Sequence, residues 1–311
     1  MNEQLKAISQ SARLFFGNDA VIEACERGNV NTSCYINHHG GRYFIKTETR
    51  ADMPDFYSGQ IERDIEGNRL LKENGLPCAE TLFSGMNSLN QSYMISTAVQ
   101  GRMVSEIWPY STYEEKQRIR DGIIEIVNAL GKIHSPCFGS ICSGSKIGRY
   151  ASWKEACTSL ISIALRDCLN FGSLNRDEAK TIQSAADMNA ELFAYKDPPS
   201  FCHMDIHWYN VMADNGKITG LLDFGCALYA PSYSDIFRLD GAFTRGNGRF
   251  FSHPPLKLNR HENFSADLLN TLDYYVFLSM KNNTAGARER LVQMCRDYLK
   301  VIGNNIHLPK E

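Results

Sequence analysis

The sequence changes character near residue 100, and this change constrains the fold more than any other feature. The first hundred residues carry most of the strand-like segments, whereas the chain after Gly101 shows long stretches of helical periodicity. A chain of 311 residues is long enough for two domains that each bury a core. We therefore predict an α+β fold of two lobes, with an N-terminal lobe over 1–100, a hinge at 96–101 and a C-terminal lobe over 101–311.

The first lobe is predicted to be a small antiparallel sheet with one helix. Two segments of alternating residues are joined by His38-His39-Gly40-Gly41, which predicts a β-hairpin. A charged helical segment follows and ends at Asn74-Gly75 and Pro77. The strand-like segments read, in chain order, "SCYIN", "RYFIK", "AETLFSG" and "SYMISTAV".

Helical signals dominate the second lobe. Thr112 and Glu115 have the spacing of a capping box, which marks a helix start. The apolar face that follows consists of Ile119, Ile123, Val127, Leu130 and Ile133. Further helices are predicted at 152–167, 175–195, 265–281 and 286–302. The second lobe is therefore expected to be mainly helical.

The composition is that of a globular protein close to electroneutrality. With 43% hydrophobic residues, 22% charged residues and a net charge of -2, the chain lacks the basic character of a nucleic-acid binder. Its ten cysteines contain no C-x-x-C pair and are expected to be reduced. The sequence has no run of 18 apolar residues and no basic start followed by an apolar stretch. We expect a soluble cytoplasmic protein with no nucleic-acid or membrane partner, and the oligomeric state is left open.

The stretch "HMDIHWYN", His203 to Asn210, is followed by a segment that brings two polar side chains together. Asn215-Gly216 favours a type I′ hairpin turn, which would place Asn210 opposite Leu221. Asp223 would then lie diagonally across from Asn210, with the two backbones about 7 to 8 Å apart. Amide and carboxylate oxygens at that separation can bind one hard cation. The hairpin therefore predicts a Mg²⁺ site.

Two further residues complete a set suited to phosphoryl transfer. Asp205 lies five residues before Asn210, in a position to orient or deprotonate a hydroxyl nucleophile beside a metal-bound phosphate. Lys46 ends the segment "RYFIK" in the first lobe, and a strand lysine there can grip the phosphates.

These residues resemble the motif of the aminoglycoside phosphotransferase family, a branch of the protein-kinase-like fold. The motif is "H-G-D-x-H-x-x-N … D-[FW] … D", and the matching residues are His203, Asp205, His207, Asn210, Asp223 and Asp235. The segments "RGNVNTS", "LLKENGLPCAETL", "YMISTAVQG" and "LGKIH" follow the family's order. Three departures indicate a divergent branch: Met204 replaces a glycine, Trp208-Tyr209 replace Pro-Gly, and "YAPSYSD" lacks Gly-Asp-Pro.

The resemblance implies a small-molecule kinase that uses ATP or GTP with Mg²⁺. It places Asp205 and Lys46 in the catalytic group together with His203, which braces the loop, and it makes Asp235 structural. It implies a lysine partner on the following helix, with Glu66 preferred and Glu62 as second choice. The remaining nucleotide contacts that it implies are Gly28, Asn31, Thr32 and Ser33 in the phosphate loop and Thr97 and Val99 in the hinge.

The acceptor and two rival functional classes stay open at this point. An aminoglycoside antibiotic is the first expectation, which would make this a resistance enzyme. From Cys226 onward, however, the chain has 11 Lys and Arg against 8 Asp and Glu, so a hygromycin-like aminocyclitol, a macrolide, or a sugar or amino-alcohol metabolite is also considered. A zinc hydrolase using His203, Asp205 and His207 is one rival class. A nucleotide-binding pseudokinase is the other.

Overall fold

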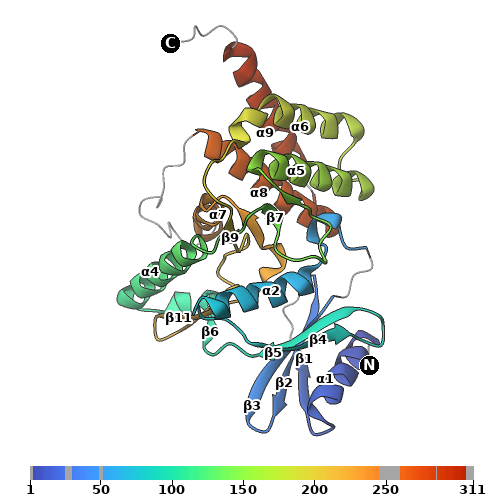
Figure 1. The fold of residues 1–311 in the computed structure, drawn as a ribbon, viewed down its shortest axis with the longest axis vertical. Coiled ribbons are helices and arrows are strands. Elements are labelled where there is room, and N and C mark those ends of the chain that lie inside the picture. The colour runs from blue at the N-terminus through green and yellow to red at the C-terminus, as the bar shows by residue number, and fades with distance from the viewer. Residues whose placement is uncertain (1–2, 25–29, 49–51, 245–259, 285, 306–311) are drawn as a thin grey trace.

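The computed structural model describes residues 3–24, 30–48, 52–244, 260–284 and 286–305, and these residues form two lobes (Figure 1). A sheet with one helix against it lies at the lower end of Figure 1, and a group of helices lies at the upper end. This is the two-lobed α+β architecture that the sequence predicts.

The sheet of the first lobe is antiparallel, with the strand order β1-β2-β3-β5-β4. Its strands are β1 (Val21–Ala24), β2 (Thr32–His38), β3 (Gly41–Thr47), β4 (Thr81–Met86) and β5 (Ser92–Thr97). The predicted hairpin joins β2 to β3, and its register places Ser33 opposite Lys46. The lysine strand therefore lies in the middle of the sheet, beside the segment that leads in from the expected phosphate loop.

One helix packs against this sheet and is absent from the sequence-based expectations. Helix α1 (Glu3–Phe16) buries Ile8 and Ala12 in one apolar cluster with Ile36 of β2 and Ile45 of β3. The apolar stripe of α1 contains small residues, which weakens its helical signal. The first lobe therefore contains one helix more than predicted.

Helix α2 (Gln60–Glu73) joins the two lobes. It ends where predicted, at Asn74, and Gly75 follows with a positive φ of 67°. Its residues Leu70 and Leu71 lie in the same apolar cluster as Ile119 of the second lobe. The face of α2 that packs into the core of the second lobe also carries Asp64 and Gly67, next to Phe224.

The second lobe is mainly helical. The predicted capping box of Thr112 and Glu115 is present at the start of the long helix that follows. Ser152 with Glu155 and Asn175 with Glu178 cap two further helices in the same way. The helices are α3 (Val104–Ile107), α4 (Tyr113–Leu130), α5 (Trp153–Asn170), α6 (Arg176–Met188), α7 (Tyr233–Thr244), α8 (Arg260–Met280) and α9 (Ala287–Asn305). Of these, α3 and α7 have no counterpart among the predicted helices.

Short strands lie between the helices and carry the loops of the site. They pair in the orders β11-β10-β6 and β8-β7-β12-β9. Their bounds are β6 (Arg102–Met103), β7 (Phe138–Ser140), β8 (Arg149–Tyr150), β9 (Ser200–Cys202), β10 (Val211–Asp214), β11 (Lys217–Leu221) and β12 (Leu228–Ala230). Among the described helices, none has both the length and the apolar character that a membrane span requires.

The β10–β11 hairpin has the predicted turn but a register shifted by one residue. Asn215 and Gly216 have φ values of 49° and 78°, as a type I′ turn requires, and Asp214 lies opposite Lys217. A bulge between Met212 and Ala213 makes Val211, rather than Asn210, the partner of Leu221. The expected pairing of Asn210 with Leu221 is therefore wrong. The Asn210 carbonyl instead accepts a hydrogen bond of 2.9 Å from the Leu222 N–H, directly before Asp223.

Candidate active site

Lys46 connects the two lobes through two carboxylates. Its Nζ lies 2.6 Å from Asp64 Oδ2 on α2 and 2.8 Å from Asp223 Oδ1, which follows β11. The side chains of Lys46 and Asp64 are only 10% and 3% exposed. Burial alone would lower the pKa of the Lys46 ammonium, but the charges of Asp223 and Asp64 outweigh burial and raise it. The lysine is therefore held in its charged form.

The partner of Lys46 on α2 corrects the sequence-based choice. Glu66 bonds instead to Arg69 on the outer face of the helix, and the Glu62 carboxylate accepts a hydrogen bond of 3.2 Å from the Ser92 hydroxyl. Both expected partners are wrong because α2 turns the face carrying Asp64 toward Lys46. Asp64 and Gly67 lie three residues apart and so share that face. A glycine within a charged helix was the one signal in the sequence that could have indicated this face.

Two further bonds hold α2 against the segment Asp223-Phe224-Gly225. The Phe224 N–H donates to Asp64 Oδ1 over 2.6 Å, and Arg63 Nη1 donates to the Gly225 carbonyl over 2.9 Å. Arg63 is 1% exposed and also donates to Ser145 Oγ over 2.6 Å. Sequence reasoning missed both Arg63 and Asp64. Together these residues fix where the Asp223 carboxylate lies relative to α2.

Asp223 has the properties of a metal-binding carboxylate. It adopts a left-handed backbone conformation with φ 64°, and its side chain is 49% exposed beside Lys46. Burial by itself would raise the pKa of the Asp223 carboxyl, but the charge and hydrogen bond of Lys46 outweigh burial and lower it. Asp223 therefore presents an ionised oxygen to the open side of the site.

His203 and Asp235 brace the loop that carries Asp205. The ring of His203 is buried, with Nε2 2.9 Å from the Leu222 carbonyl and Nδ1 accepting from the Asp205 N–H over 3.3 Å. The Asp235 carboxylate accepts from the N–H groups of His203 and Met204 over 2.8 Å and 2.7 Å. Both ring nitrogens of His203 are therefore engaged. This contradicts the zinc-hydrolase alternative, which needs His203 as a metal ligand.

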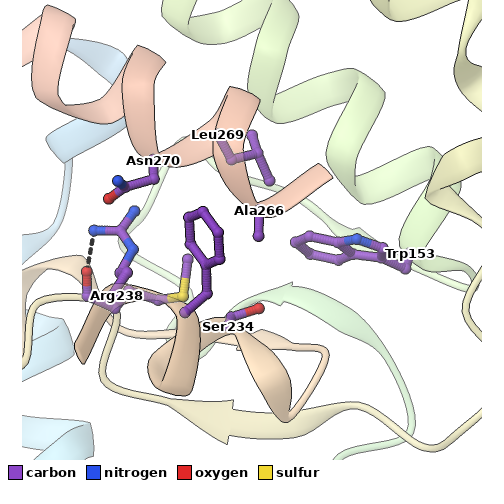
Figure 2. Close-up of a pocket in the computed structure, with 8 residues that line it drawn as sticks. Trp153, Ser234, Arg238, Ala266, Leu269 and Asn270 are labelled. Carbon is purple, nitrogen blue, oxygen red and sulfur yellow. Dashed lines mark hydrogen bonds between the residues drawn. The ribbon is translucent and has the colours of Figure 1, made fainter. Parts of the chain in front are cut away.

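Met204 adopts the left-handed conformation that glycine occupies more readily. Its φ is 64°, and its carbonyl accepts a hydrogen bond from the guanidinium of Arg238. Figure 2 shows Arg238 with this bond, drawn as a dashed line, at one side of a small pocket and Trp153 at the other side. Arg238 also forms an ion pair of 2.6 Å with Asp273. These contacts hold the backbone at Met204, next to Asp205.

Asn210 and His207 position the Asp205 carboxylate. Asn210 Nδ2 donates to the carbonyl and to Oδ2 of Asp205 over 3.0 Å and 3.1 Å. His207 Nε2 lies 3.5 Å from the same carboxylate oxygen. Because Nδ2 of Asn210 faces Asp205, the amide oxygen Oδ1 points away from it. The side chain of Asp205 is 38% exposed, so an acceptor can reach it.

Backbone hydrogen bonds join the two halves of the site, because Leu222, next to Asp223, donates from its N–H to the Asn210 carbonyl and accepts at its carbonyl from His203 Nε2. Burial alone would lower the pKa of His207, but its hydrogen bond to Asp205 and the charges of Asp205 and Asp223 raise it. The structure thus brings together Lys46, Asp205, Asn210 and Asp223, which are far apart in the sequence.

The described part of the expected phosphate loop, Asn31 to Ser33, leads into β2 beside Lys46. Gly28 lies outside the described residues. Asn31 is buried and donates to Gln60 Oε1 at the start of α2 over 2.8 Å, while its own Oδ1 is buried without a hydrogen-bond partner among the described residues. Thr32 and Ser33 follow on β2, with Ser33 opposite Lys46.

The hinge differs in part from the expectation. The Thr97 N–H donates to the Glu80 carbonyl over 2.9 Å, and the Thr97 hydroxyl accepts from the Glu80 N–H over 2.9 Å. The Thr97 N–H is therefore already occupied, so the expected pairing of adenine with backbone groups near Thr97 and Val99 would have to use other groups. Val99 packs closely on Gly220 of β11, because a side-chain carbon on residue 220 would lie 2.7 Å from Val99 Cγ1.

Comparisons with known proteins agree with this geometry. A family model described as the phosphotransferase enzyme family matches residues 21–251. No curated protein matches significantly. The chain is similar in structure to a thermostable mutant of aminoglycoside phosphotransferase APH(4)-Ia in its apo form, with TM-score 0.68 and 17% identity over 94% of this chain and 98% of that one.

Two further structures have the same kind of fold. A mutant of APH(4)-Ia in ternary complex with AMP-PNP and hygromycin B has TM-score 0.67 at 17% identity, over 94% of this chain and 98% of that chain. A putative fructosamine-3-kinase from Haemophilus somnus 129PT has TM-score 0.66 at 17% identity, over 95% and 97% of the two chains. At this level of identity the likeness establishes the fold, and it confirms the predicted kinase-like architecture.

Proposed function

Since this chain belongs to the phosphotransferase enzyme family, we propose that it transfers the γ-phosphoryl group of ATP or GTP to a hydroxyl of a small molecule. One observation carries the proposal. Lys46 bonds to Asp64 of α2 and to Asp223, and Leu222, next to Asp223, is hydrogen-bonded to Asn210 and His203 of the loop that holds Asp205. A phosphate-gripping lysine, a metal carboxylate and an acceptor carboxylate thus lie in one continuous site, as phosphoryl transfer requires.

The nucleotide would bind between the two lobes. We assign the α and β phosphates to Lys46, whose Asp64 partner keeps the ammonium oriented. The γ-phosphate side of the nucleotide lies against Asn31, Thr32 and Ser33, where N–H groups and small side chains can approach phosphate oxygens. For the adenine or guanine base, Val99 is the hinge position that we retain.

Asn210 and Asp223 fit a Mg²⁺ ion. Both offer oxygen ligands, the Asp223 carboxylate is ionised and half exposed, and Asn210 Oδ1 points away from Asp205. The ion neutralises charge on the transferring phosphate when it is bound. The same residues are unsuited to Zn²⁺, which prefers nitrogen and sulfur ligands in a tetrahedral arrangement.

Asp205 would orient the acceptor hydroxyl and take its proton as the bond to phosphorus forms. Its carboxylate is held by Asn210 and His207, so it is positioned before the acceptor arrives. His203 and Asp235 act through the loop backbone and do not reach the acceptor. This division makes Asp205 the residue on which transfer depends.

We propose an aminoglycoside-type aminocyclitol as the acceptor, because the similar APH(4)-Ia structure contains hygromycin B. A sugar metabolite is the second candidate, and one observation favours it. A putative fructosamine-3-kinase is similar in structure at the same 17% identity as the APH(4)-Ia complex, and fructosamine is a sugar derivative rather than a polycationic antibiotic. A resistance role and a metabolic role thus predict acceptors of different charge.

A transfer screen separates these possibilities. Purified protein is incubated with ATP or GTP labelled in the γ-phosphate, Mg²⁺, and single acceptors from a panel of aminoglycosides, aminocyclitols, macrolides, fructosamines and amino alcohols. Labelled product with an aminocyclitol supports the first acceptor class, and product with a fructosamine supports the second. A nucleotide-binding pseudokinase would bind ATP or GTP but label no acceptor.

A further inference from the structure

Three side chains with metal-binding atoms meet at the end of the first-lobe sheet that is remote from the active site. Asp19 lies in the turn between α1 and β1, His38 ends β2, and His39 begins the turn to β3. Asp19 Oδ2 lies 3.4 Å from His38 Nε2 and 3.3 Å from His39 Nε2. One ligand atom from each residue lies within 4.8 Å of those from the other two.

The backbone directs both imidazole rings to the same place. Neighbouring side chains on a strand point to opposite faces, so consecutive histidines would normally diverge. Here His39 and Gly40 have φ values of 47° and 79°, which are those of a type I′ turn. The turn brings the two rings to a centroid separation of 4.0 Å. Gly17, with φ 99°, leaves room for the Asp19 side chain, because a side-chain carbon on residue 17 would lie 3.0 Å from Asp19 Oδ1.

The separations are compatible with coordination of a single ion. An N–H···O hydrogen bond is usually about 2.9 to 3.0 Å long between its heavy atoms, and both separations exceed this. In a tetrahedral Zn²⁺ site with bonds of about 2.0 to 2.1 Å, neighbouring ligand atoms lie about 3.3 to 3.4 Å apart. The two distances from Asp19 Oδ2 are therefore compatible with two edges of a zinc tetrahedron.

We propose that Asp19, His38 and His39 bind a divalent transition metal, Zn²⁺ foremost. The ligand atoms are Asp19 Oδ2 and the Nε2 atoms of the two histidines, a set of donors that suits Zn²⁺ and does not suit Mg²⁺. Asp19 and His39 are exposed, with 59% and 76% of their side-chain surfaces accessible, so water completes the coordination. The metal joins the turn after α1 to the β2–β3 turn and stabilises the first lobe.

The site is separate from phosphoryl transfer. His38 ends β2, whereas Thr32 at the other end of that strand lies beside the expected phosphate loop. A strand of 7 residues spans roughly 20 Å, which is too far for a bound ion to contact the phosphates. Loss of the metal should therefore change stability without changing the transfer mechanism.

A titration with Co²⁺ tests the proposal, since the visible spectrum of Co²⁺ distinguishes nitrogen and oxygen ligands from thiolates. The variant is His39→Asn, because asparagine favours the type I′ turn and keeps the hairpin while it removes the imidazole. The matched control is Asn18→Ala, a substitution of an exposed neighbour of Asp19. We expect wild type and the control to bind one more equivalent of Co²⁺ than His39→Asn, with a spectrum free of thiolate bands.

Competition and stability measurements complete the test. Zn²⁺ should displace that equivalent of Co²⁺ and raise the unfolding temperature of wild type more than that of His39→Asn. Asp19→Asn should lose the same equivalent, whereas transfer activity with Mg²⁺ should stay at the wild-type level in all variants. Identical Co²⁺ titrations for wild type, His39→Asn and Asp19→Asn would overturn the proposal. A spectrum of thiolate type that none of the variants changes would overturn it as well.

Discussion

The ring of Phe224 occupies the space that a side chain on Gly67 would need. A side-chain carbon at position 67 would lie 2.4 Å from Phe224 Cγ, well inside van der Waals contact. Phe224 is 1% exposed and cannot move aside without disturbing the cluster that contains Leu70 and Leu71 of α2. The glycine thus lets α2 approach Asp223-Phe224-Gly225 closely enough for Asp64 to reach Lys46.

We predict that Gly67→Ala destabilises the protein, opposite in sign to the usual effect of this change in a helix. Alanine in place of a helical glycine ordinarily adds roughly 0.5 to 1 kcal/mol of stability. Here overpacking should cost roughly 1 to 3 kcal/mol, and α2 should shift away from Lys46. Urea unfolding measures the first effect and nucleotide affinity the second. A variant more stable than wild type would show that α2 does not pack on Phe224 in this way.

Asp64, rather than Glu66, should support nucleotide turnover. We predict that Asp64→Asn lowers kcat/KM for the nucleotide by about tenfold or more, since the buried Lys46 loses the charge that orients it. Glu66→Gln is the matched control on the same helix and should stay within about twofold of wild type, because it breaks only an exposed pair with Arg69. Steady-state kinetics at varied nucleotide concentration measure kcat/KM for both variants. The opposite ranking of the two variants would restore the assignment of Glu66.

Local signals predicted much of the fold, because they depend on few neighbouring residues. The capping box of Thr112 and Glu115 and the turn at Asn215-Gly216 formed as expected. The predicted register of β11 was wrong, because the pairing of β11 depends on contacts outside the hairpin. The bulge between Met212 and Ala213 shifts it, while Thr219 on β11 donates to the Gln100 carbonyl. No local pattern in the hairpin encodes that contact.

The candidate site was predictable to a similar degree. The loop from His203 to Asn210 and the position of Asp223 follow from a motif, so they could be read directly from the sequence. The lysine partner could not, because the choice among Glu62, Asp64 and Glu66 depends on which face of α2 packs on Phe224. Tertiary packing decided that face.

Met204 offers a test of the backbone at the loop before Asp205. Both Met204→Gly and Met204→Ala remove a buried side chain, but only glycine relieves the left-handed conformation. We predict that the glycine variant is more stable than the alanine variant by about 1 kcal/mol. Denaturant unfolding of both variants gives this difference. An alanine variant that is the more stable of the two would show that φ at this position is not positive in solution.

The ion pair between α6 and α9 should make stability depend on pH. Glu178 accepts two hydrogen bonds of 2.8 Å from Arg288, and mainly for this reason the pKa of the Glu178 carboxyl is below its ordinary value of 4.5. A pKa lowered by folding contributes stability that is complete above 4.5 and is lost as the pH falls through the folded-state value. The pair is partly exposed, so we expect at most about 1 kcal/mol.

Arg288→Gln should therefore be less stable than wild type at neutral pH and equal to it in acid below the folded-state pKa of Glu178. Arg290→Gln is the matched control, because this arginine bonds to the Gly286 carbonyl rather than to an acid. Urea unfolding at both pH values measures the difference. A deficit in Arg288→Gln that is the same in acid would show that Glu178 contributes nothing to it.

The central claim is that Asp205 acts on the acceptor while Lys46 and Asp223 act on the nucleotide and its metal. Asp205→Asn tests it most directly, because the change keeps the shape of the side chain and removes its charge. Nucleotide affinity and phosphate transfer to the best acceptor are measured on the same preparation. We predict that Mg²⁺-dependent nucleotide affinity stays near the wild-type value while transfer falls by roughly 10²-fold or more. Transfer by Asp205→Asn near the wild-type rate would contradict this account.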